Sequence, residues 1–143
     1  MPPRFLIDNS AWVRLADSAL NEERRNEIAD QLEAGELATC LPFLLEAGYS
    51  GRHAREYDDL LHELRALPHL AIDDDIEALA LDAHRQLARV GHHRLPPVDI
   101  LVAAIAHRHE VGVLHYDRDY DLILSKTSLD FAIVWLARRG TLS

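Results

Sequence analysis

The chain has 143 residues, a formal net charge of −9 and a single cysteine, Cys40. This length predicts one domain, residues 1–143, and the charge argues against a generic nucleic-acid-binding surface, which is usually basic. The lone cysteine excludes an intramolecular disulfide, no apolar run approaches the ~20 residues of a membrane span, and the first residues show no signal-peptide core, so we expect a soluble, cytoplasmic protein with no membrane association.

Strand-like and helix-like patterns alternate from one end of the chain to the other. Strands are predicted at 4–7, 36–41, 69–72, 113–116 and 132–134. Helices are predicted at 9–17, 22–34, 43–50, 54–66, 75–90, 98–109 and 119–125. Such alternation is typical of a parallel sheet flanked by helices, so the predicted fold class is α/β.

Four acidic residues stand where a predicted strand ends or where the following helix begins. They are Asp8, Glu46, Asp99 and Asp117. Because ligands of an open parallel sheet bind outside the carboxyl ends of its strands, these carboxylates are expected to converge on one cleft. Crowded carboxylates repel one another and favour a divalent cation, and oxygen-only ligands select Mg²⁺ or Mn²⁺. Sites of this kind typically serve phosphate chemistry.

Each acid also has an ordinary explanation. Asp8 is able to cap a helix that starts just after it, the helix dipole favours Asp99, and Asp117 belongs to an acid-rich turn. Glu46 is harder to explain, because it lies in a helix that is apolar nearly all round, where an unpaired carboxylate costs free energy unless it faces a cleft. The set of four, rather than any single member, therefore indicates a site.

Four segments of the chain, 5–10, 44–49, 97–104 and 113–120, resemble the acidic motifs of PIN domains, specifically the VapC-type toxins of toxin–antitoxin pairs. Their order and spacing and the total length agree, so the resemblance covers essentially the whole chain. It implies a three-layer α/β/α sandwich around a central parallel sheet and a Mg²⁺- or Mn²⁺-dependent endoribonuclease. It also implies a homodimer and a cognate VapB-like antitoxin that occludes the active site.

The chain departs from the family pattern at two points. Asn9 stands where the family more often has threonine, so Ser10 is the better-matched hydroxyl for positioning a metal-bound water or a substrate phosphate. The last motif holds three aspartates, which leaves open whether Asp119 joins Asp117 at the metal or only orients a water.

Hydrolysis of an RNA phosphodiester needs an activated water, neutralised non-bridging oxygens and a stabilised leaving oxygen, and metal ions held by carboxylates supply all three. We assign Asp8 and Asp99 as principal ligands. Glu46 and Asp117 complete the site directly or through water, and one of them helps to deprotonate the nucleophile. The resemblance suggests products with a 5′-phosphate and a 3′-hydroxyl, whereas the RNA that is cut and the number of ions stay open.

Other residues carry weaker signals. Possible contacts to RNA phosphates are Arg52, Arg55 and Arg94, although surface arginines are more often solvated or salt-bridged. The pair His92–His93 fits a solvated loop better than a metal site. We expect Trp12 and Trp135 in the core or in a dimer interface, and Cys40 as inert packing inside a strand.

Two other classes of protein place acids at strand ends. A non-enzymatic, Mg²⁺-binding receiver-like signalling domain needs an acidic pair after the first strand and a lysine after a late strand, but Asn9 follows Asp8, and Lys126 lies beyond a helix-like segment. A haloacid-dehalogenase-like phosphatase needs an aspartate at the position of Ser10. A catalytically silent PIN scaffold is the remaining alternative, and the presence of all four acids counts against it.

Overall fold

The computed structural model describes residues 2–143. Its strands are β1 (Phe5–Ile7), β2 (Leu37–Ala38), β3 (Gly112–His115) and β4 (Ile133–Trp135). Its helices are α1 (Asn9–Trp12), α2 (Glu22–Glu33), α3 (Leu41–Tyr49), α4 (Ala54–Leu64), α5 (Asp74–Arg89), α6 (Pro97–His109) and α7 (Asp119–Lys126). Within this part of the chain, no helix is both long and apolar enough to cross a membrane.

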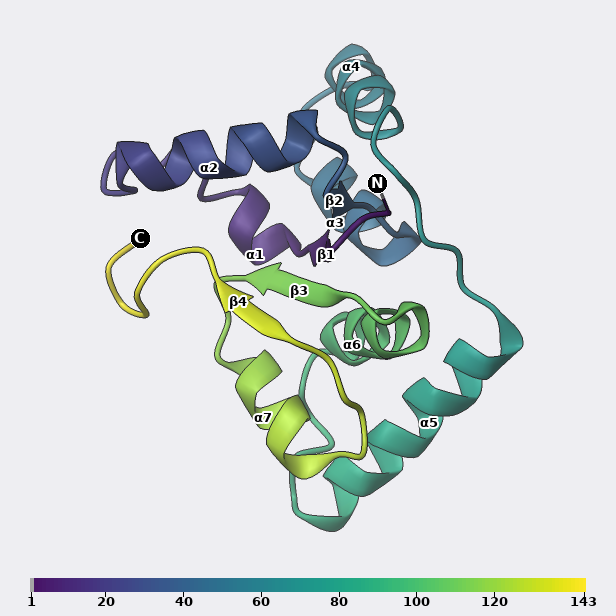
Figure 1. Ribbon diagram of the computed structural model, residues 1–143. Coiled ribbons are helices and arrows are strands. Elements are labelled where there is room, and N and C mark those ends of the chain that lie inside the picture. The colour runs from purple at the N-terminus through teal and green to yellow at the C-terminus, as the bar shows by residue number, and fades with distance from the viewer. Residues whose placement is uncertain (1) are drawn as a thin grey trace.

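The four strands form one parallel sheet in the order β2-β1-β3-β4 (Figure 1). β1 is an inner strand, with Leu6 paired to Ala38 on one side and to Val113 on the other. Because all the strands run the same way, their carboxyl ends meet at one edge of the sheet, which is the edge where α1 and α7 begin. The predicted α/β fold class is confirmed.

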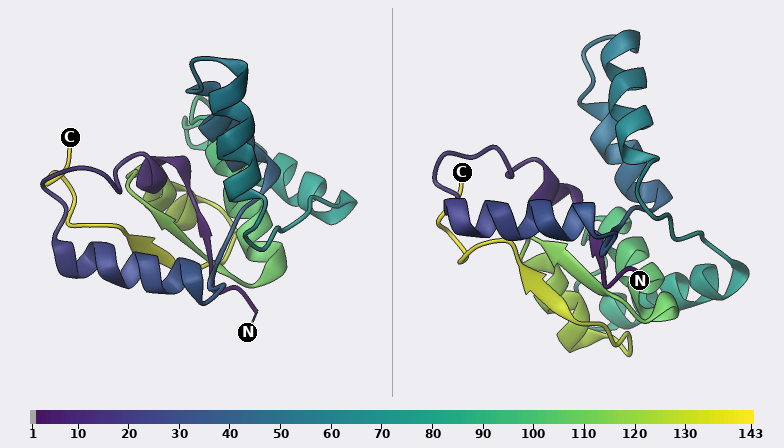
Figure 2. Two further views of the ribbon diagram at one scale, coloured as in Figure 1. Left: turned by 90° about the horizontal axis from the view of Figure 1, so that it is seen from above. Right: turned by 45° about the horizontal axis from the view of Figure 1, so that its top comes forward.

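Helices cover both faces of the sheet, which confirms the predicted three-layer α/β/α arrangement. α1 and α2 lie on one side, and α5, α6 and α7 lie on the other (Figures 1 and 2). α3 and α4 form a hairpin that projects from the body of the molecule beyond β2 (Figure 2). α6 is the most deeply placed helix, because its run 102–106 is completely buried against the inner strands.

Three predicted elements differ from the structure. The 69–72 strand is reduced to one parallel bridge between Thr39 and His69, because the neighbouring chain leaves the sheet at Cys40 to begin α3 and the 69–72 segment leads into Asp73, which caps α5. The 36–41 strand ends early, so that Cys40 is the N-cap residue of α3 rather than part of a strand. Burial raises the pKa of its thiol to about 12, in keeping with inert packing.

The 9–17 helix is also shorter than predicted, since α1 ends at Trp12. The chain continues through tight turns, in which Arg14 and Leu15 donate to carbonyls three residues earlier. Arg25 of α2 stabilises these turns, because its guanidinium donates to the carbonyls of Leu15 and Asp17. Asp8 stays at the carboxyl edge of the sheet because its amide donates to the carbonyl of Leu114 in β3 while its side chain caps α1.

Candidate active site

The four predicted acids lie at the carboxyl edge of the sheet. Asp8 follows β1 and caps α1, Asp99 is in the first turn of α6, and Asp117 lies between β3 and α7. Glu46 comes from the middle of α3. The pKa of the Asp99 carboxyl is raised to about 8, mainly by burial. The negative charges of the four neighbouring carboxylates, Asp8, Asp117, Asp119 and Glu46, add to this increase. The five carboxylates therefore form one electrostatically coupled cluster.

Asp8 is buried and is held from two sides. Its Oδ2 accepts hydrogen bonds from the Ser10 amide at 3.0 Å and from the Ser10 hydroxyl at 2.6 Å, and its Oδ1 accepts one from the Tyr120 hydroxyl at 2.6 Å. The Ser10 hydroxyl also accepts a hydrogen bond from the amide of Tyr116 at 2.9 Å. Because its only proton points at Asp8, Ser10 is not free to donate to a phosphate, and it acts here by fixing the Asp8 carboxylate between β1 and β3.

Three of the carboxylates are close enough to share one ion. Asp99, Asp117 and Asp119 each offer an oxygen, and these oxygens lie within 4.8 Å of one another. Asp99 Oδ2 is buried without a hydrogen-bond partner, and Asp117 Oδ1 accepts from the Asp119 amide at 2.9 Å. An unpartnered buried carboxylate oxygen is costly unless a cation or a proton satisfies it. This donor set, all of it oxygen, fits a hard divalent cation.

Glu46 stands at the rim of this cluster. Its side chain is half-buried, and burial, together with the charges of Asp8 and Asp117, raises the pKa of its carboxyl. Burial and the charge of Asp117 likewise raise the pKa of Asp119. Because the pKa of each of these neighbouring carboxyls is raised, a positive charge placed among them would relieve their mutual repulsion.

Comparison with known proteins agrees with this geometry. Residues 5–123 match the sequence model of the PIN domain. The chain belongs to the PIN-domain family. Ribonuclease VapC18 of Mycobacterium tuberculosis is 33% identical over 141 residues, which cover 96% of this chain and 98% of that protein. Ribonuclease VapC2 of the same species is 38% identical over 129 residues, which cover 87% of each chain.

Solved structures resemble this PIN domain in fold. DNA-bound VapBC from Salmonella typhimurium aligns with a TM-score of 0.72 at 16% identity, over 94% of this chain and 99% of that chain. VapBC-5 from Mycobacterium tuberculosis aligns with a TM-score of 0.64 at 21% identity, over 93% of this chain and 100% of that chain.

Two residues of the site were not identified from the sequence. Tyr120 of α7 is completely buried, and its hydroxyl lies 2.6 Å from Asp8 Oδ1 and 3.5 Å from Asp99 Oδ1, so it bridges two of the acids. Burial and these two charges raise its pKa well above the ordinary value, which keeps the hydroxyl protonated and able to donate. Its place three residues after Asp117 in the last motif is the one signal in the sequence.

The second missed residue is His115, the last residue of β3. Its ring is buried between Tyr120 and Trp135, at centroid distances of 4.9 and 4.8 Å, and its Nδ1 accepts a hydrogen bond from the Asp117 amide at 3.1 Å. Burial lowers the pKa of the imidazole, which favours the neutral ring with its proton on Nε2. His115 therefore fixes the turn that carries Asp117 and adds no positive charge to the cluster.

The arginines predicted to contact RNA are all exposed. Arg52 precedes α4 and pairs with Glu56 at 3.4 Å, Arg55 is in the first turn of α4, and Arg94 lies in the loop before α6. No hydrogen bond or ion pair within residues 2–143 connects these three side chains to the acids. Arg94 shares its loop with His92 and His93, and His84 Nε2 hydrogen-bonds the His93 carbonyl at 3.0 Å.

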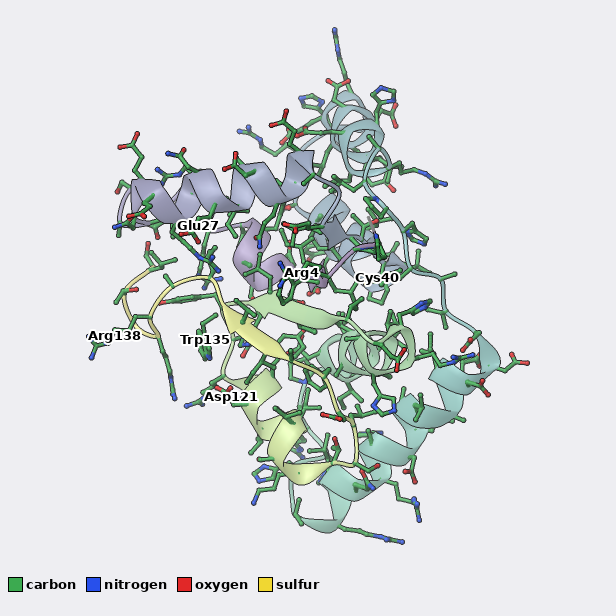
Figure 3. All side chains as sticks on the ribbon, in the orientation of Figure 1. Arg4, Glu27, Cys40, Asp121, Trp135 and Arg138 are labelled. Atoms are coloured by element: carbon green, nitrogen blue, oxygen red, sulfur yellow. The ribbon has the colours of Figure 1, made fainter. Side chains whose placement is uncertain are left out.

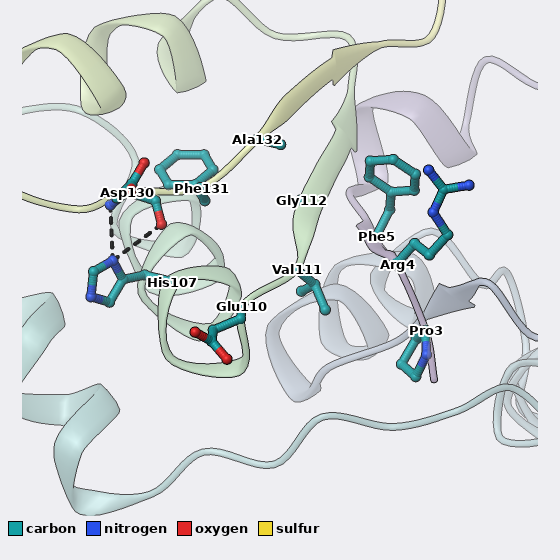
Figure 4. A pocket seen from close by; sticks show the side chains of 10 residues that line it. All are labelled: Pro3, Arg4, Phe5, His107, Glu110, Val111, Gly112, Asp130, Phe131 and Ala132. Atoms are coloured by element: carbon teal, nitrogen blue, oxygen red, sulfur yellow. Dashed lines mark hydrogen bonds between the residues drawn. The ribbon is translucent and has the colours of Figure 1, made fainter. Parts of the chain in front are cut away.

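A hollow of about 660 Å³ lies at the other end of the sheet, where the strands begin (Figure 4). Phe5, Gly112 and Phe131 line it, and none of the clustered acids does. A β-carbon on Gly112 would lie 2.7 Å from the Phe5 ring, so this residue must be glycine for β1 and β3 to approach. The hollow's distance from every coupled carboxylate argues against it as the active site of this PIN domain.

Proposed function

We propose that this PIN domain is a metal-dependent endoribonuclease and the toxin of a type II toxin–antitoxin pair. The observation that carries the proposal is the cluster of coupled carboxylates at the carboxyl edge of the sheet, with a buried and unpartnered Asp99 oxygen at its centre. The relatives support the choice of substrate, because proteins named Ribonuclease VapC are 30–38% identical over most or all of the chain.

The resident ion in this proposal is Mg²⁺, for which Mn²⁺ substitutes. Asp99, Asp117 and Asp119 would hold it through carboxylate oxygens, with Asp8 as a further principal ligand and Glu46 acting directly or through water. When bound, the ion neutralises charge on the scissile phosphate and lowers the pKa of a bound water.

In this proposal the protein's own side chains orient the ligand carboxylates and deprotonate the attacking water. Tyr120 and Ser10 hold the Asp8 carboxylate so that its oxygens keep one orientation, and His115 does the same for the turn of Asp117. Glu46 at the rim, with its raised pKa, is the better placed proton acceptor for the attacking water. Attack at phosphorus breaks the bond to the 3′ oxygen and leaves a 5′-phosphate and a 3′-hydroxyl.

A protein partner completes the proposal. Several solved structures with this fold are VapBC complexes, and a free ribonuclease in the cytoplasm would damage its host, so we infer a cognate VapB-like antitoxin. The net charge of −9 and the acidic cleft favour a basic inhibitory segment, with an arginine that reaches the carboxylates and competes with the ion. The toxin itself is expected to be a homodimer.

Apolar side chains beside the cleft supply anchors for that segment. Leu45 and Tyr49, on the same helix as Glu46, are 60% and 92% exposed, and Val13 beyond α1 is 53% exposed. Large exposed apolar groups next to a functional cleft are typical of a binding surface. Arg52, Arg55 and Arg94 remain proposed contacts for the outer part of the RNA.

The decisive experiment incubates purified protein with a mixture of RNAs and Mn²⁺, with and without EDTA. Cleavage that EDTA abolishes and that yields 5′-phosphate ends supports the proposal. A protein that binds Mn²⁺ but leaves every RNA intact would instead be a silent scaffold. The receiver-like alternative is disfavoured, because Lys126 is exposed at the far end of α7 rather than beside the acids.

A further inference from the structure

A groove leads away from the acidic cluster along the outer side of α7. It encloses about 710 Å³, and its lining includes Arg118, Asp119, Leu122 and Arg139. Since Asp119 also belongs to the group of carboxylates that would share an ion, the groove opens directly at the site.

A second hollow of about 410 Å³ continues the groove. It is lined by Asp121, Trp135, Ala137, Arg138 and Arg139, so it shares Asp121 and Arg139 with the first. Figure 3 shows Trp135, Asp121 and Arg138 on the same side of the molecule. We call the two hollows together the α7 groove.

The arginines of the α7 groove have no side-chain partners among the residues that the structure describes. Arg118, Arg138 and Arg139 are exposed, and none of their guanidinium groups makes an ion pair or a hydrogen bond with any residue in the range 2–143. Elsewhere the arginines are often engaged, as Arg24 is with Glu27 and Arg108 is with Asp73. Three free guanidinium groups beside one cleft stand out on a chain whose net charge is −9.

The local charge fits a polyanion. Asp121 is the one carboxylate in the α7 groove that does not belong to the ion-binding cluster, so three positive charges face one negative charge once an ion neutralises Asp119. Guanidinium groups bind phosphate oxygens with a planar fork. The half-buried indole of Trp135 adds an aromatic surface, and arginines together with aromatic rings are the usual lining of single-strand channels.

We propose that the α7 groove holds the backbone of a single-stranded RNA as it enters the acidic site. Arg118 lies nearest the scissile phosphate, Arg139 and Arg138 hold phosphates further along, and Trp135 stacks on a base. The inference rests on the proposed ribonuclease function and adds the path and strandedness of the substrate. A basic antitoxin segment would meet an excess of positive charge here, so the α7 groove belongs to the substrate and not to the inhibitor.

The test compares two double variants with the same change of charge. Arg138→Gln with Arg139→Gln alters the α7 groove away from the proposed ligands, whereas Arg4→Gln with Arg65→Gln alters exposed arginines at the amino edge and at the end of α4. Cleavage of a short single-stranded RNA in Mn²⁺ gives KM and kcat. We expect KM to rise roughly tenfold or more for the groove variant alone, with a small change in kcat and an unchanged thermal shift on Mn²⁺ addition.

Binding supplies a second readout that does not require cleavage. Anisotropy of a labelled oligoribonucleotide is measured on Asp99→Asn protein with and without the groove substitutions over a range of salt. Loss of two phosphate contacts should reduce the slope of log affinity against log salt by about 1.4. Duplex RNA and polyglutamate of equal charge serve as competitors and should displace the oligonucleotide poorly.

The outcomes separate the two proposals. If the wild type cuts RNA and the groove variant matches the Arg4/Arg65 control in KM and salt slope, the α7 groove proposal is overturned while the ribonuclease stands. Equal competition by polyglutamate also overturns it, because the groove would then be only a positive patch. If no RNA is cut by the wild type, the proposed function fails, and the anisotropy comparison still decides whether the α7 groove binds single-stranded RNA.

Discussion

The Tyr120 hydroxyl donates to Asp8 Oδ1 at 2.6 Å, across 112 positions of the sequence. The tyrosine comes from α7 and the aspartate from the end of β1, so the hydrogen bond joins the last acidic motif to the first. The same hydroxyl lies 3.5 Å from Asp99 Oδ1, so its single proton orients Asp8 and its oxygen lies beside the other carboxylate that we assign as a principal ligand.

Removal of that hydroxyl should weaken the metal site while leaving the fold intact. In Tyr120→Phe the buried ring stays, the unfolding free energy falls by about 1 kcal/mol, and Mn²⁺ affinity drops roughly tenfold or more because Asp8 loses its orienting donor. Calorimetric titration of Mn²⁺ measures the affinity. Tyr49→Phe, at a tyrosine that is 92% exposed, is the control and should bind like the wild type. Unchanged Mn²⁺ affinity in Tyr120→Phe would refute the orienting role.

Substitution of the assigned ligands should abolish cleavage. Asp99→Asn and, separately, Asp8→Asn keep the side-chain shape but remove the charge, so we expect RNA cleavage in limiting Mg²⁺ to fall by more than ~100-fold. Asp58→Asn on exposed α4 makes the same chemical change away from the site and should cut at the wild-type rate. Wild-type cleavage by either site variant would show that its aspartate is not a ligand.

The pKa of Asp99 makes the stability of the metal-free protein depend on pH. In the folded chain this pKa is about 8, raised from 3.8, so the folded state holds a proton that the unfolded chain releases between these values. The stabilisation is complete below the lower value and is lost as the pH rises through the upper one. Between about pH 5.5 and about pH 8.5 in EDTA we expect the unfolding free energy to fall by about 3 kcal/mol and the melting temperature to fall by roughly 6–12 °C.

Asp99→Asn and Mn²⁺ are the controls for this pH dependence. The variant has no titrating group at that position, so its melting temperature should fall by less over the same range. Mn²⁺ at millimolar concentration should stabilise the wild type most at the higher pH, where the carboxylates are ionised. A wild-type melting temperature that is indifferent to Mn²⁺ would count strongly against a clustered site.

Ser10 should matter for stability as well as for activity. Ser10→Ala removes the 2.6 Å hydrogen bond to Asp8 and leaves the Tyr116 amide without its acceptor, which we expect to cost about 1–3 kcal/mol in urea unfolding. Ser18→Ala, on the exposed turn before α2, should change the unfolding free energy by less than about 0.5 kcal/mol. Equal unfolding midpoints for the two variants would show that the Ser10 bridge contributes nothing.

Expression of the protein with and without the products of neighbouring genes tests whether it has an antitoxin partner. The wild type alone should arrest growth, Asp99→Asn should not, and co-expression with a small adjacent basic protein should yield a tight complex without ribonuclease activity. Exchange of Leu45 and Tyr49 for serine should weaken the complex without reducing cleavage by the free protein. Harmless expression of the active wild type in several hosts would defeat the toxin proposal, even with the nuclease intact.

The sequence predicted those parts of the structure that depend on local pattern. Strands and helices alternate along the chain, and ligands of a parallel sheet gather at its carboxyl edge. These two facts were sufficient to predict that Asp8, Asp99 and Asp117 lie at one edge of the sheet. Where pairing is decided by distant residues the prediction was wrong, as at 69–72, where an apolar run makes only a single bridge.

Tyr120 and His115 were missed for a related reason. In the sequence, Tyr120 looks like any core aromatic of a short helix, and His115 like a polar interruption of a strand. Their roles follow from the placement of β3 beside β1, which brings the start of α7 next to Asp8. Strand order depends on packing across the whole domain, and hydrophobic periodicity carries no information about it.

The central position of β1 has a consequence for how the site forms during folding. Its neighbour β3 begins at Gly112, more than a hundred positions along the chain, and Asp117, Asp119 and Tyr120 lie further on still. The carboxylate cluster is therefore complete only after β1 and β3 have paired and α7 has packed beside Asp8. Contacts of such large sequence separation form late and slowly, so we expect the site to assemble together with the sheet and not before it.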